Sequence, residues 1–135
     1  MSTTTSGGAS GLVPSRSKTS RHRVHRGLAS QAVVADYFRA NGFPYALSTG
    51  SGRTGTDVTG VIGVDIEVKA RRGLPIEATM NQLKKRASDG VIPMAVLRID
   101  GQGPSEIANW PALMPLSVAI RLLREAGYDA PVFAG

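Results

Sequence analysis

The chain has 135 residues, a length that suits one domain and leaves no room for two full hydrophobic cores. Sixteen lysines and arginines against ten aspartates and glutamates give a formal net charge of +6, and a domain this basic usually binds a polyanion, either nucleic acid or an anionic membrane surface. The absence of cysteine excludes disulfide scaffolds, thiolate zinc sites and cysteine nucleophiles, so any metal must be held by oxygen or imidazole ligands.

No segment has the roughly 18 consecutive apolar residues of a membrane helix, because the most apolar one, Trp110 to Leu123, contains Pro111 and Pro115. The N-terminus also lacks the apolar region of a secretory signal. We therefore expect a cytoplasmic protein without a membrane partner.

Residues 1–26 are predicted to form a disordered basic tail. This segment consists mainly of Ser, Thr, Gly and basic residues and has almost no large apolar side chains, so it cannot bury enough surface to offset its ordering entropy. Its positive charge is unopposed, because the first acidic residue of the chain is Asp36. Such an arm could add phosphate contacts, or it could simply keep the protein in solution.

A folded domain is expected over residues 27–135. Apolar residues recur at helical spacing from Leu28 to Phe38, and Asn41-Gly42 supplies a helix stop. The later elements are expected as a strand at 45–48, an exposed glycine-rich loop at 49–55, a hairpin of strands at 56–61 and 64–70, a helix at 76–87, a strand at 93–99 and a helix at 116–126. This order implies an α/β or α+β fold in which helices flank a mixed β-sheet.

Three charged residues, Asp65, Glu67 and Lys69, alternate along the second hairpin strand and would share one face of it. The two carboxylates repel each other at this spacing, and a bound cation would relieve the repulsion. Asp57 on the neighbouring strand can add a further carboxylate to the same face. Carboxylate oxygens favour Mg²⁺ or Mn²⁺ over softer metals.

Lys69 would place a positive charge beside that cation. There it could orient or deprotonate an attacking water, or neutralise charge in the transition state of phosphodiester hydrolysis. The alternative is a solvated strand face with a cross-strand salt bridge. We favour the catalytic interpretation, because a glycine-rich loop precedes Asp57 and the chain is basic.

Asp57, followed after nine residues by Glu67-Val68-Lys69, resembles the signature of the PD-(D/E)xK nucleases, with Thr56 in place of the proline. The resemblance implies a restriction-endonuclease-like fold. It also implies that Asp57 and Glu67 bind Mg²⁺, for which Mn²⁺ can substitute, that the Val68 carbonyl assists, and that Lys69 acts on the water.

Within that superfamily the chain is most similar to archaeal-type Holliday junction resolvases, small basic homodimeric enzymes that cut four-way DNA junctions. The likeness covers about residues 26–99. Those enzymes carry a glutamate four residues after the glycine that starts the first helix, and this chain has Gln31 there. Gln31 could still bind a metal weakly through its amide oxygen, or it could be a partly buried amide in an apolar stripe.

Two further residues follow from the same resemblance. Ser51, in the glycine-rich loop, matches a serine close to the scissile phosphate, although a plain flexible linker is an alternative. Gln82, on the helix after the strand of Glu67, matches a glutamine that supports the lysine or the water. Its alternative is an exposed helical side chain.

Basic residues flank the proposed site and could form a track for DNA phosphates, with binding that weakens steeply as salt rises. Singly, each is expected to be a solvated surface charge. The residues of this track are Arg26, Arg53, Arg71, Arg72, Lys84, Lys85 and Arg86. No phosphate-binding loop for a nucleotide cofactor is present, because the Gly50 to Gly55 loop lacks a Gly-Lys-Ser/Thr ending.

The resemblance therefore predicts a Mg²⁺-dependent endonuclease that cleaves branched DNA in recombination and repair. Two alternatives stay open: another nuclease of the superfamily acting in DNA repair or restriction, and a non-catalytic DNA-binding protein of the same fold. A homodimer is implied, for which the apolar segment from Trp110 to Leu123 could supply the interface; this segment could instead cap the core.

Overall fold

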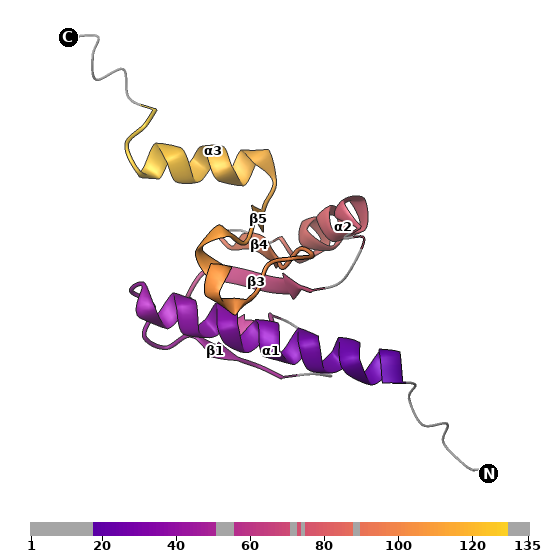
Figure 1. Ribbon diagram of the computed structural model, residues 1–135. Coiled ribbons are helices and arrows are strands. Elements are labelled where there is room, and N and C mark those ends of the chain that lie inside the picture. Colours follow the sequence, from indigo (N-terminus) through magenta and orange to yellow (C-terminus); the bar gives the residue numbers. More distant parts are fainter. Residues whose placement is uncertain (1–17, 51–55, 71–72, 74, 88–89, 130–135) are drawn as a thin grey trace.

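The computed structural model describes residues 18–50, 56–70, 73, 75–87 and 90–129, with side chains from Gly27 onward. Its elements in chain order are α1 (Lys18–Ala40), β1 (Leu47–Ser48), β2 (Val58–Thr59), β3 (Val64–Lys69), α2 (Ile76–Arg86), β4 (Ile92–Leu97), the 3-10 helix η1 (Pro104–Asn109), β5 (Ala112–Leu113) and α3 (Leu116–Glu125). Figure 1 shows their arrangement.

The five strands form one mixed sheet in the order β1-β2-β3-β4-β5. Strands β3 and β4 are parallel, and the other neighbouring pairs are antiparallel. The parallel pair is joined by α2, because two parallel neighbours need a crossover connection rather than a tight turn. The expected mixed α/β architecture is thus confirmed, although η1 and β5 were not predicted from the sequence.

Helices α1 and α2 cover opposite faces of the sheet (Figure 1). On the α1 face, Ile66 packs with Val34 of the helix in one buried cluster. On the α2 face, Leu83 of the helix packs with Ala95 and Leu97 of β4. Because strand residues alternate between faces, Glu67 lies on the α2 side, where Ala95 is its partner in the register.

Helix α1 begins at Lys18, so the prediction of a disordered tail through Arg26 is wrong for residues 18–26. Residues 1–17 lie outside the described part of the chain. Extending a helix adds one hydrogen bond per residue without the cost of a new nucleus, and Lys and Arg are good helix formers. A helix anchored by its buried second half can therefore continue through a polar segment that has no apolar stripe of its own.

The predicted hairpin between β2 and β3 is confirmed, with a turn in which the Val64 amide donates to the Val61 carbonyl. Gly63 occupies the left-handed region there, with φ of 81°. Strand β2 is shorter than the predicted 56–61, and it ends where Gly60 takes a positive φ of 83°. A Cβ at Gly60 would lie 1.8 Å from the carbonyl oxygen of Tyr45, so the chain requires glycine at this crossing.

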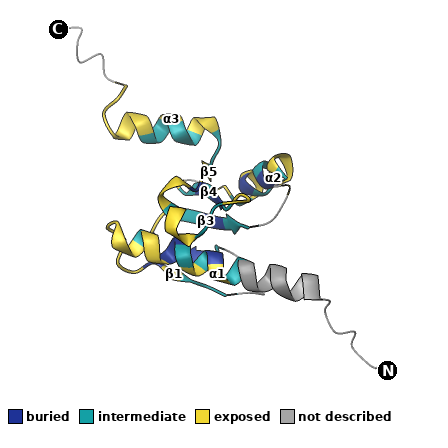
Figure 2. Ribbon diagram, in the orientation of Figure 1, coloured by how far each residue is buried: buried dark blue, intermediate teal, exposed yellow. Residues whose placement is uncertain are grey.

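The apolar C-terminal segment divides into two parts with different environments. Trp110 is buried in the α1-side core, and its indole donates a hydrogen bond to the Gly103 carbonyl at 3.2 Å. Helix α3, by contrast, has no buried residue, and Figure 2 shows only exposed and intermediate positions along it. Capping of the core thus applies to Trp110 and not to α3. No helix in the described part of the chain, α3 included, has the length and apolar character needed to cross a bilayer.

Candidate active site

The three alternating charged residues of β3 share one face of the sheet, as predicted, and α2 covers that face. The Lys69 ammonium nitrogen is 3.7 Å from Oε1 of Glu67, and one arginine side chain contacts both Asp65 and Glu67. Glu67 is buried, with only 5% of its surface exposed. A carboxylate this deep needs charged or hydrogen-bonding partners, because burying an unpaired charge costs far more than burying a paired one.

Gln82 of α2 provides one of those partners. Its side-chain amide donates to Oε1 of Glu67 at 3.0 Å. Gln82 therefore lies in the predicted site rather than on the exposed face of its helix. Its contact is with the carboxylate that was expected to bind the metal, whereas the sequence predicted support for the lysine or the water.

Asp57 is positioned where β2 separates from β3. Its backbone amide donates to the Ile66 carbonyl at 2.7 Å, and its Oδ2 accepts a hydrogen bond from the Val68 amide at 2.8 Å. The Val68 amide, which in a regular sheet would donate to a backbone carbonyl of the neighbouring strand, thus donates to the Asp57 side chain instead. This fixes the carboxylate beside Glu67-Val68, which is where the predicted metal site requires it.

Thr56 performs a similar function one residue earlier, which no sequence pattern indicated. The hydroxyl of Thr56 accepts a hydrogen bond from the Ile66 amide at 2.9 Å and lies 2.8 Å from the Val58 carbonyl oxygen, to which it donates. Thr56, at the position where the PD-(D/E)xK signature has a proline, therefore holds the start of β2 against β3. A proline could not supply this hydroxyl.

Arg86, in the last turn of α2, differs most from its prediction. Its Nε and Nη2 donate to the two oxygens of Asp65 at 2.8 and 2.7 Å, and its Nη1 donates to Oε2 of Glu67. We expected Arg86 in a phosphate track and a bound cation between the two carboxylates. Instead, the guanidinium itself relieves the repulsion between Asp65 and Glu67.

The pKa of Glu67 is raised above its ordinary value of 4.5, chiefly because burial disfavours the charged form and next because Asp57 is a nearby negative charge. Asp65 raises this pKa as well, whereas Arg86 and Lys69 lower it. The hydrogen bond from the Val68 amide to Asp57 accounts for the effect of Asp57, because it places the Asp57 carboxylate one residue along β3 from Glu67.

The donors at this site are oxygen atoms, the ligands that Mg²⁺ prefers. Among the described residues there is no group of three or more acidic or histidine side chains that could hold a metal ion. The oxygens at this site belong to two carboxylates, Asp57 and Glu67, and to the Val68 carbonyl. Those of Glu67 are shared with Gln82, Lys69 and Arg86. Mg²⁺ usually keeps several waters and takes one or two carboxylates from the protein, so this all-oxygen set fits Mg²⁺.

Gln31 was the other predicted ligand, and it lies on α1, which covers the opposite face of the sheet. Its Oε1 is buried and accepts no hydrogen bond from the described residues. None of the described contacts joins Gln31 to Asp57 or Glu67. Its role as a metal ligand therefore stays a prediction.

The remaining predicted residues divide into two groups. Lys84 and Lys85 are exposed on α2, in the same helical turn as Arg86. Ser51, Arg53, Arg71 and Arg72 lie outside the described residues. Arg26 lies in α1, but its side chain is outside the described part of the structure.

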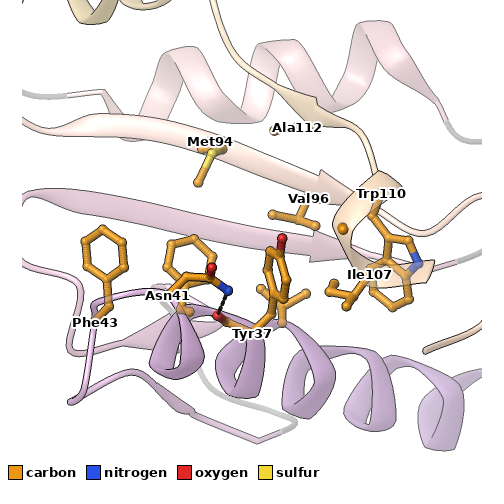
Figure 3. A pocket seen from close by; sticks show the side chains of 11 residues that line it. Tyr37, Asn41, Phe43, Met94, Val96, Ile107, Trp110 and Ala112 are labelled. Carbon is orange, nitrogen blue, oxygen red and sulfur yellow. Dashed lines mark hydrogen bonds between the residues drawn. The ribbon is translucent and has the colours of Figure 1, made fainter. Parts of the chain in front are cut away.

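A cavity of about 250 Å³ lies on the other side of the sheet, between α1, β4 and η1. Figure 3 shows Phe43, Met94, Val96, Ile107 and Trp110 around it. The dashed line in Figure 3 is the hydrogen bond from the side chain of Asn41, just after α1, to the backbone carbonyl of Tyr37 in that helix. Because its walls are apolar, this cavity lacks the carboxylates and amines of the β3 site, and we assign no chemistry to it.

Comparison with known proteins found no match to any family model, curated protein or solved structure. The functional assignment therefore depends on the arrangement of Asp57, Glu67, Lys69 and Gln82 and on the composition of the chain.

Proposed function

We propose that this protein is a Mg²⁺-dependent endodeoxyribonuclease of the PD-(D/E)xK type that cleaves branched DNA. The observation that carries the proposal is the convergence of Asp57, Glu67 and Lys69 at one place on β3, with Glu67 buried and held by Gln82. The alternative to a catalytic site, a solvated strand face, would leave the Glu67 side chain exposed to water. The mixed sheet with helices on both faces also agrees with a restriction-endonuclease-like fold.

In this proposal Asp57 and Glu67 would hold Mg²⁺, assisted by the Val68 carbonyl. When bound, the ion supplies positive charge that stabilises the phosphodiester as it becomes more negative. Lys69 sits 3.7 Å from Glu67, so its ammonium group can donate hydrogen bonds to the attacking water or to a phosphate oxygen next to that carboxylate.

The chemistry is hydrolysis of one phosphodiester bond. The water oxygen forms a bond to phosphorus, the bond from phosphorus to the 3′ oxygen breaks, and a proton passes from the water to that leaving oxygen. The products carry a 5′-phosphate and a 3′-hydroxyl. Glu67 must be ionised for this role, and Gln82 and Arg86 help to keep its oxygens in place.

The composition supports recognition by shape and backbone rather than by base sequence. Aromatic residues make up only 5% of the chain, which is few for a protein that stacks on bases. Lys84 and Lys85 are exposed on α2 and could contact phosphates beside the cut. These features suit a DNA junction inside the cell, where the protein would act in recombination and repair.

A homodimer belongs to the same proposal, because symmetric cutting of a junction needs paired sites. Support comes from α3, whose apolar residues Leu116, Ile120 and Leu123 are exposed. Sedimentation at micromolar concentration should return a dimer. A species of about 14.2 kDa, with and without junction DNA, would contradict pairing.

The test of the activity is a panel of end-labelled DNAs incubated with the protein and Mg²⁺ or Mn²⁺. We expect cleavage of a four-way junction and slower cleavage of plain duplex. Equal rates on both would favour another repair or restriction nuclease of the superfamily. The absence of cutting on every substrate, with either metal, would contradict the nuclease assignment.

A second candidate is a DNA-binding protein of the same fold that does not cleave. It is favoured by one observation: Arg86 already satisfies Asp65 and Glu67 without a metal. Exchange of Ca²⁺ for Mg²⁺ separates the two functions. An active enzyme should bind junction DNA in Ca²⁺ and cut it after Mg²⁺ is added, whereas a binding protein should respond to neither ion.

A further inference from the structure

Arg86 links two carboxylates of β3 through three donors. Two of them, Nε and Nη2, bind the two oxygens of Asp65, and the third, Nη1, binds Oε2 of Glu67. The three side chains are largely buried: counting side-chain atoms alone, 21% of Arg86, 17% of Asp65 and 7% of Glu67 is exposed. We refer to this group as the Asp65–Arg86–Glu67 bridge.

Arg86 is bound more firmly to Asp65 than to Glu67, because two of its nitrogens bind Asp65 and one binds Glu67. A guanidinium that forms two parallel hydrogen bonds to one carboxylate is held in plane and position. Asp65 therefore anchors Arg86, and the remaining nitrogen is aimed at Glu67. Oε1 of Glu67 is meanwhile held by Gln82 and Lys69, so both oxygens of this carboxylate have partners in the absence of any metal.

Stability alone does not explain this arrangement. A buried ion pair is often no more stabilising than apolar side chains of similar volume, because each charge must lose its water. Leu83, on the same helix, shows that α2 can pack on this face of the sheet through apolar contacts. Three charged side chains in place of such contacts therefore call for another explanation.

We infer that Arg86, anchored by Asp65, positions Glu67 and competes with the divalent cation for it, so that this bridge sets how tightly the site binds metal. The inference rests on the proposed metal-dependent function. In the absence of metal the guanidinium neutralises Glu67 and keeps its carboxylate in place. A divalent cation that binds the same Glu67 oxygens must displace the Arg86 guanidinium or lie close to its positive charge. Either effect weakens binding of the cation.

The experiment measures binding of Mn²⁺ to the full chain at pH 8 without DNA, by calorimetry and by the loss of the free-ion electron paramagnetic signal. Arg86→Gln removes the competing charge, and we expect its Kd for Mn²⁺ to fall at least about tenfold below that of the unmodified protein. Arg86→Lys keeps the charge, and its Kd should stay within about threefold of the unmodified value.

Arg124→Gln is the matched control, because it makes the same substitution at an exposed arginine of α3, away from the site. Its Kd should equal that of the unmodified protein. If Arg86→Gln is folded by circular dichroism and binds Mn²⁺ no more tightly than Arg124→Gln, the inference is wrong. A role in folding alone would lower stability and would not tighten metal binding.

A second measurement uses the unmodified chain, in case Arg86→Gln does not fold. The Nε–H resonance of Arg86, assigned by its absence in Arg86→Lys, should shift on addition of Mg²⁺ with the same Kd as the binding itself. The corresponding resonance of Arg124 should not move. An Arg86 resonance that stays in place while Mg²⁺ binds would overturn the inference.

Failure of the proposed function gives a different result. If neither the unmodified protein nor Arg86→Gln binds Mn²⁺ and neither cuts DNA, both the metal site and the bridge inference are wrong. If the unmodified protein binds the ion and Arg86→Gln binds it equally, only the bridge inference fails. If Arg86→Gln binds Mn²⁺ and the unmodified protein does not, the result would support the inference, because Arg86 would then exclude the ion completely.

Discussion

Ile66 and Glu67 are neighbours in sequence and are almost equally buried, yet they face environments of opposite chemistry. Ile66, with 0% exposure, packs under α1 among apolar side chains. Glu67, with 5% exposure, lies under α2 among Lys69, Gln82 and Arg86. The α1 face stabilises the fold by apolar burial, whereas burial of a carboxylate on the α2 face costs free energy that its hydrogen-bonding and charged partners must offset.

The largest expected effect is on catalysis from the α2 face. Glu67→Gln keeps the shape of the side chain but removes its charge, and we expect junction cleavage in Mg²⁺ to fall by about 10³-fold or more, because a metal ligand is lost. Initial cleavage rates measure this. Glu77→Gln, at an exposed glutamate in the first turn of α2, should retain the full rate. Equal rates for both variants would contradict the role of Glu67.

The matching change on the α1 face should act on stability. Ile66→Ala leaves a cavity beside Val34 and Val58, and we expect a loss of about 2–5 kcal/mol in the free energy of unfolding. Urea denaturation followed by fluorescence of Trp110 measures this. Ile62→Ala, in the hairpin turn with Ile62 99% exposed, should change stability by less than about 0.5 kcal/mol. A small effect at Ile66 would mean that the α1 face is not the stabilising core.

Thr56 precedes Asp57 and holds β2 against β3, because its hydroxyl accepts a hydrogen bond from the Ile66 amide, while the Asp57 carboxylate accepts one from the Val68 amide. Thr56→Ala should cost about 1–3 kcal/mol, since it leaves the Ile66 amide without an acceptor. Thr56→Ser keeps the hydroxyl and should stay close to the unmodified protein. Urea denaturation of the two variants side by side provides the comparison. Similar losses in both would attribute the effect to the methyl group instead.

The smallest expected effect is a pH dependence of stability in metal-free buffer. Because the pKa of Glu67 is raised in the folded protein, the folded state binds more protons than the unfolded state at pH values between 4.5 and that raised pKa. The contribution of Glu67 to unfolding free energy is therefore present below pH 4.5 and is lost as pH rises through the folded pKa. Urea denaturation across this range should show the decline, and Glu67→Gln should lack it. The same slope in both proteins would assign it to another group.

The clustering of charged side chains on β3 could be predicted from the sequence because it depends only on local rules. A strand places alternate residues on one face, so Asp65, Glu67 and Lys69 had to lie together once β3 was identified. The hairpin then brought Asp57 alongside, since Gly63 permits the tight turn.

The role of Arg86 could not be predicted in this way. It contacts Glu67 across 19 residues of sequence, and this contact depends on the rotation of α2 about its axis over the sheet. Basic residues on such a helix are usually solvated, so Arg86 could not be distinguished from Lys84 and Lys85 beforehand. Strand β5 has only two residues, too few to show a periodic pattern.

Lys69 offers the most direct test of the central claim, because it is the one member of the site whose proposed role is in the reaction itself rather than in holding the metal. In Lys69→Ala, a labelled four-way junction should bind in Ca²⁺ with unchanged affinity, and its cleavage after addition of Mg²⁺ should fall by about 10²- to 10⁴-fold. Full-rate cleavage by this variant in Mg²⁺ would contradict the proposed active site.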